Sequence, residues 1–77
     1  MRVNVELTDT FGGEANYSWV KRSTFDLDDN ASDLAIVRKA KAEIGLSGIR
    51  CKRHAYGEMI VLRPQGYCTV AFISFDY

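Results

Sequence analysis

The balance between one helical segment and five strand-like segments limits the folds open to this chain more than any other feature. One helix cannot cover both faces of a sheet of that size. We therefore expect an α+β domain with an antiparallel sheet of four to five strands, one helix packed on one face, and the order β-β-α-β-β-β. The second face should be exposed or covered by a partner, and the pattern does not show which face the helix covers.

The strand predictions rest on alternation and on β-branched and aromatic content. Residues 2–8 alternate cleanly between apolar and polar side chains. A turn at Gly12 and Gly13 follows, and residues 15–22 are predicted to return as the second strand of a hairpin. The other predicted strands are residues 49–55, 59–62 and 67–75.

The predicted helix begins after Asn30, which is a good N-cap residue, and Asp33 in its first turn suits the helix dipole. Gly45 is expected to end the helix in a left-handed conformation. Leu46 follows at the position where a Schellman motif carries an apolar residue. The predicted buried stripe consists of Leu34, Val37, Ala40 and Ile44.

The length of 77 residues is that of one domain, spanning residues 1–77. No apolar run approaches the roughly 18 residues that a membrane-spanning helix needs, and the first residues lack the apolar stretch of a signal peptide. These patterns predict a cytoplasmic protein that does not enter a membrane.

Charge is sorted along the chain, although the formal net charge is zero. Residues 1–33 carry seven acidic and three basic side chains, whereas residues 34–77 carry three acidic and seven basic ones. Such a layout on a small domain indicates docking onto a charged partner without identifying that partner.

The sequence favours no catalytic, metal or cofactor site, and we expect no enzyme. His54 is the only histidine, no CxxC motif occurs, and the two cysteines are expected to be buried free thiols. Cys51 lies three positions before His54, so the two side chains should point to opposite faces of a strand. A pair between Cys68 and His54 stays open.

A non-enzymatic binding module is the first functional hypothesis. The hairpin offers three aromatic residues as a partner-binding surface, namely Phe11, Tyr17 and Trp19. Tyr17 and Trp19 would be energetic anchors if they are exposed. Burial of Trp19 in the core is the interpretation that the sequence favours.

A nucleic-acid-binding module is the second hypothesis, and its candidate residues are Arg38, Lys39, Arg50, Lys52, Arg53 and His54. Arg50, Lys52 and His54 should project from one face of a strand and could track phosphates, with exposed tyrosines as stacking platforms. The alternative is a solvated basic surface that protects an edge strand from aggregation. A third hypothesis is a homodimer that seals the open sheet face.

Residues 8–20, with the sequence TDTFGGEANYSWV, resemble short proteins encoded by bacteriophages, prophages and other mobile elements of bacteria. Residues 33–41, 48–51 and 62–64 extend this resemblance over almost the whole chain. It implies a phage-borne accessory protein in the cytoplasm of a bacterial host, with a host or phage protein as the first candidate partner. The resemblance brings no assigned activity and therefore no catalytic residue.

Overall fold

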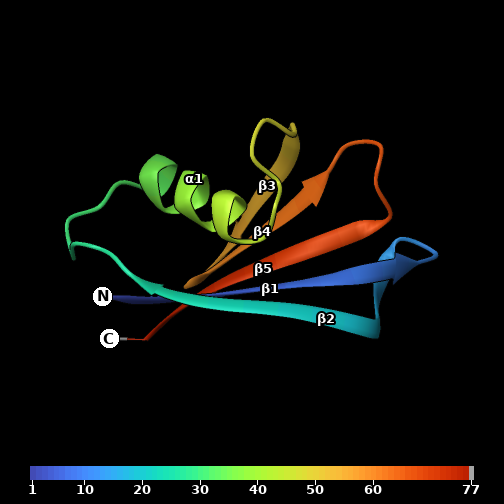
Figure 1. Ribbon diagram of the computed structural model, residues 1–77, viewed down its shortest axis with the longest axis horizontal. Helices are drawn as coiled ribbons and strands as arrows, with labels where there is room; N and C mark the ends of the chain where they lie inside the picture. Colours follow the sequence, from blue (N-terminus) through green and yellow to red (C-terminus); the bar gives the residue numbers. More distant parts are fainter. Residues whose placement is uncertain (77) are drawn as a thin grey trace.

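The computed structural model describes residues 1–76, which form one helix and one five-stranded antiparallel sheet (Figure 1). The elements are β1 (Arg2–Phe11), β2 (Glu14–Asp26), α1 (Asp33–Glu43), β3 (Cys51–Tyr56), β4 (Met59–Pro64) and β5 (Thr69–Asp76). The strands lie side by side in the order β2-β1-β5-β4-β3, and each neighbouring pair is antiparallel. The predicted α+β class and element order are confirmed.

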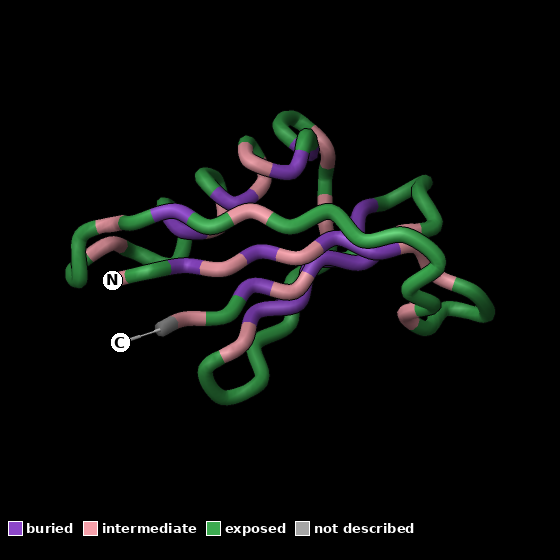
Figure 2. Tube along the Cα trace, turned by 60° about the horizontal axis from the view of Figure 1, so that its bottom comes forward, coloured by how far each residue is buried: buried purple, intermediate pink, exposed green. Residues whose placement is uncertain are grey.

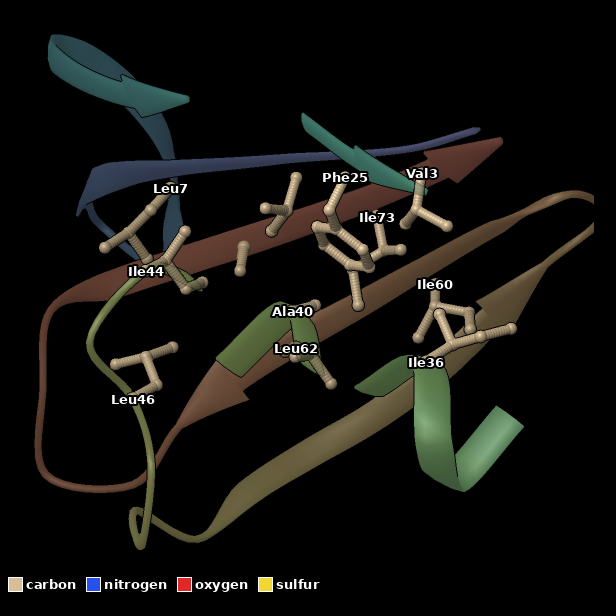
Figure 3. Close-up of a cluster of buried hydrophobic side chains, with 12 residues drawn as sticks. Val3, Leu7, Phe25, Ile36, Ala40, Ile44, Leu46, Ile60, Leu62 and Ile73 are labelled. Atoms are coloured by element: carbon tan, nitrogen blue, oxygen red, sulfur yellow. The ribbon is translucent and has the colours of Figure 1, made fainter. Parts of the chain in front are cut away.

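Helix α1 packs on the face of the sheet to which the odd-numbered residues of β1 point. Val3 and Val5 on this face are almost fully buried, and Val5 lies opposite Ile73 of β5. Figure 3 shows Val3 and Ile73 on the side of the sheet that faces α1, which contributes Ile36 and Ala40 to the same buried cluster. We call this the helix-covered face and the opposite one the helix-free face. Figure 2 shows that buried residues follow the central strands, whereas the hairpin ends are exposed.

The helix begins later than the sequence predicted. Ser32, not Asn30, is the N-cap, and its hydroxyl oxygen accepts a hydrogen bond of 3.2 Å from the backbone N–H of Ala35. Asn30 instead donates its own backbone N–H to the carboxylate of Asp28. The prediction was wrong because Asp28 captures this residue in a local turn before the helix starts.

The predicted Schellman ending of α1 is confirmed. Gly45 has a φ of +79°. The N–H of Leu46 donates to the carbonyl of Lys41 over 2.8 Å, which is the long hydrogen bond of this motif. The Leu46 side chain is buried in the core. The short helix does not have the length and apolarity needed to cross a membrane.

The prediction that Leu34 belongs to the buried stripe of the helix was wrong. Ile36, Ala40 and Ile44 form the buried line, whereas Leu34 is 61% exposed. Leu34 lies two residues before Ile36, which is about 200° around a helix of 3.6 residues per turn. Because the line repeats every four residues from Ile36, Leu34 faces away from the sheet.

The cysteines are both free, but they are not both buried as predicted. Cys51 is half-buried against the core, and Cys68 is exposed. The difference arises because β5 starts at Thr69, so Cys68 lies in the turn before the strand rather than within it.

We expect Ser32→Ala to lower the free energy of unfolding by about 1 kcal/mol, since it removes the acceptor for the Ala35 N–H. Urea denaturation monitored by circular dichroism measures this as a lower midpoint at an unchanged slope. Asn30→Ala is the matched control and should leave the midpoint almost unchanged. A larger loss for Asn30→Ala would contradict the assignment of the cap.

Candidate binding site on the helix-free face

Side chains on the helix-free face form rows across the sheet because the strand register is regular. One row contains Arg22, Glu6, Phe72, Val61 and His54. On β2, β1 and β5, the flanking rows are Thr24–Asn4–Ser74 and Val20–Thr8–Val70. On β4 and β3, the flanking pairs are Met59–Tyr56 and Arg63–Lys52. The helix-free face therefore carries apolar, polar and charged side chains. An acid–base pair lies toward the β2 edge of the sheet, and basic side chains lie toward the β3 edge.

The β1–β2 hairpin is interrupted by a large bulge. The register shifts between Thr8 and Thr10, so that residues 16–19 of β2 lie opposite Asp9 alone. Figure 1 shows this irregularity as the corner at the right-hand end of β2. The Thr8 hydroxyl accepts a hydrogen bond of 3.0 Å from the Tyr17 N–H and donates one of 3.0 Å to the Trp19 carbonyl. Because Thr8 points to the helix-free face, these bonds hold the bulge over that face.

Asp9 holds the same bulge from the neighbouring position. Its carboxylate accepts hydrogen bonds from the Ser18 hydroxyl (2.6 Å), the Asn16 side-chain amide (2.9 Å) and the Ser18 backbone N–H (2.9 Å). The side-chain bonds from Ser18 and then Asn16 are the main reasons that the pKa of Asp9 lies far below its ordinary value of 3.8. Sequence analysis assigned no role to Thr8 or Asp9. The only sequence signal for this role was a weak one: Thr8 and Asp9 precede a turn, and the polar residues that follow the turn can donate hydrogen bonds to their side chains.

The tip of the hairpin closes one end of the helix-free face. Thr8 and Val70 are fully buried although no helix covers them. Arg63 of β4 donates from Nη1 to the carbonyl of Gly13 over 2.8 Å, which ties the tip to the sheet. The chain therefore covers part of this face itself, where the sequence predicted solvent or a partner.

A groove of about 420 Å³ lies beside the tip. Its walls include Asn4, Glu6, Tyr17, Arg22, Thr24 and Phe72. Within it, Arg22 and Glu6 form an ion pair of 2.9 Å, and the Thr24 hydroxyl donates to the Asn4 side-chain oxygen over 3.1 Å. The groove thus combines two aromatic rings with paired polar groups.

Among the described residues, Tyr17 is the only one other than glycine with a positive φ, at 57°. This conformation costs a non-glycine residue roughly 1–2 kcal/mol. Tyr17 is 54% exposed and Trp19 is 46% exposed, so the favoured interpretation of Trp19 as a core residue was wrong. The bulge removes Trp19 from the regular alternation that would have buried it. Phe11 is 80% exposed near the hairpin turn.

The predicted basic residues do not form one surface. Lys52 and His54 share the helix-free face as expected, whereas Arg53 lies on the opposite side of β3, at the position paired with Leu62. Arg50 is exposed and precedes β3. Arg38 and Lys39 belong to α1, on the far side of the sheet. Lys39 is also engaged, with Glu43 at 3.1 Å and with the ring of Phe25.

The predicted separation of Cys51 from His54 is confirmed. Cys51 packs against the core under α1, and His54 belongs to the helix-free row. Over residues 1–76, the structure contains no group of three histidine, cysteine or acidic residues that could hold a metal ion.

Comparisons with protein-family models, with curated proteins and with solved structures found no match to this chain.

We expect the hydrogen bonds that the Asp9 carboxylate accepts from Asn16 and Ser18 to make the free energy of unfolding fall at acid pH. The folded pKa is lowered, so the contribution of Asp9 is complete above its unfolded pKa of 3.8 and is lost as pH falls toward the folded value. Asp9→Asn should therefore be less stable than the wild type at pH 7, and the gap should narrow at pH 3. Urea midpoints of both proteins at the two pH values measure this. A gap that stays constant or widens in acid would contradict it.

Proposed function

We propose that this protein is a small non-enzymatic binding module whose macromolecular partner docks on the helix-free face. The observation that carries the proposal is Tyr17. Its ring lines the groove while its backbone is held in a costly conformation by Thr8. Strained residues of this kind concentrate at ligand-binding sites, where the surrounding structure enforces them.

The resemblance of residues 8–20 to phage-encoded proteins supports the setting of this proposal. That segment contains the whole bulge, from Asn16 to Trp19, and the two residues that clamp it. We infer an accessory protein of bacteriophage type that works in the cytoplasm of a bacterial host. A host or phage macromolecule is then the natural partner.

Self-association is the less favoured use of the helix-free face. Val61 and Val70 are the aliphatic residues at its centre, and both are already buried within the chain. Stable homodimers bury large apolar surfaces, and the hairpin tip has removed part of that surface here.

We therefore expect light scattering on a sizing column to give the mass of one chain, at low and at moderate salt. Partial burial of the helix-free face by the tip is the reason. A stable dimer at micromolar concentration would contradict this expectation and restore the homodimer hypothesis.

The test of the binding module is Tyr17→Asn. Asparagine tolerates positive φ better than other non-glycine residues, so the urea midpoint should stay within about 1 kcal/mol of the wild type while the ring is lost. Immobilised protein is exposed to bacterial extract, with and without nuclease, and the retained molecule is identified. The variant should retain at least about tenfold less of it, as for the loss of an aromatic hot spot.

Phe11→Ala is the matched control, since Phe11 is an exposed aromatic residue of the same hairpin that does not line the groove. It should retain the same molecule as the wild type. Equal retention by Tyr17→Asn and the wild type would overturn the proposal, as would equal losses for both variants.

A further inference from the structure

We propose that the occupant of the helix-free face is a single-stranded nucleic acid, with bases in the groove and phosphates beside Lys52 and Arg63. This inference rests on the proposed function, because it names the partner of the same face. It differs from the sequence-based hypothesis in its residues, since Arg38, Lys39 and Arg53 have no part in it.

The cationic pair is the observation that points to an anion. Lys52 of β3 and Arg63 of β4 lie directly opposite each other in the register, on the helix-free face. Like charges at such a cross-strand position are destabilising unless something neutralises them. Within the described part of the chain, neither side chain has a carboxylate partner, and the bond from Arg63 to the Gly13 carbonyl uses only one of its N–H groups. A phosphate would complete this pair.

The groove supplies what an unpaired base requires. Tyr17 and Phe72 line it and provide aromatic rings on the surface of a sheet, which is the platform that many single-strand binders use. The Arg22–Glu6 and Thr24–Asn4 pairs present both donors and acceptors to the edge of a base. Each pair is internally balanced, so the groove itself selects by shape and hydrogen bonding rather than by charge.

Neighbouring rows of side chains on the helix-free face connect the groove with the Lys52–Arg63 pair. Phe72 lies beside Val61 and then His54, and His54 is one row away from Lys52 on the same strand. The rings of His54 and Tyr56 lie 6.2 Å apart and extend the aromatic surface toward the edge of the sheet. A strand of nucleotides can therefore reach from the groove to the cationic pair. A duplex cannot place bases in the groove, because its bases are paired and stacked inside the helix.

The experiment is a fluorescence anisotropy titration with labelled oligothymidylate, oligouridylate and a duplex, each about 10 nucleotides long, which lies within the usual site size of such modules. Salt is varied between about 50 and 200 mM. Both single strands should bind more tightly than the duplex, and affinity should fall with salt. The two single-stranded arms show whether DNA or RNA is preferred.

Lys52→Ala should lower the slope of log affinity against log salt by about 0.7, the value for one phosphate contact on a single strand. Arg53→Ala is the matched control. It removes an equal charge from the next residue, on the opposite face of β3, and should leave the slope unchanged. Tyr17→Asn should weaken binding about tenfold or more at an unchanged slope, because it removes stacking and no charge.

No binding of either single strand at about 50 mM salt would overturn the inference. Tighter binding of the duplex, or equal changes of slope for Lys52→Ala and Arg53→Ala, would do the same. The proposed function is decided separately. If the extract yields a protein that Tyr17→Asn fails to retain, the face binds a protein and only the nucleic-acid inference falls. If Tyr17 affects no partner, both fall.

Discussion

The limited reach of one short helix governs the rest of this structure. The eleven residues of α1 span about 16 Å, whereas the ten residues of β1 span about 33 Å. The helix buries one face of the central strands and leaves the ends of the long hairpin without cover. The helix-free face must then be stabilised by something else, and the chain uses the tip of its own hairpin.

Thr8 and Asp9 hold the tip of the hairpin in place over the helix-free face. Thr8 is fully buried, and a buried hydroxyl without a partner would be costly. Its hydrogen bonds to Tyr17 and Trp19 satisfy the hydroxyl and at the same time direct the backbone of the bulge over the sheet. Asp9 adds three acceptor contacts to the same segment. Two adjacent polar side chains thus decide where two aromatic rings are displayed.

Sequence reasoning reached the fold because alternation and helical spacing are local signals, as in residues 2–8 and in the Gly45–Leu46 ending of α1. It failed where a tertiary contact overrides a local preference. Trp19 was expected in the core, but a bond from Thr8, eleven residues away, takes it out of the alternation. The basic residues of the helix and of the strand were expected to form one positive surface, yet the sheet lies between Lys52 and Lys39. The register of the short β3–β4 hairpin places Lys52 opposite Arg63.

The position of β5 has a consequence for how the chain acquires its structure. The hairpins β1–β2 and β3–β4 each join segments that are neighbours in sequence, but β5, the strand farthest along the chain, lies between them and pairs with both (Figure 1). Without β5, the only strand pairs left in the sheet are β1–β2 and β3–β4, and β1 and β4 each lack a neighbour on one edge. Such long-range pairing slows folding, so the continuous five-stranded sheet, with both of its faces, forms only after β5 has joined β1 and β4.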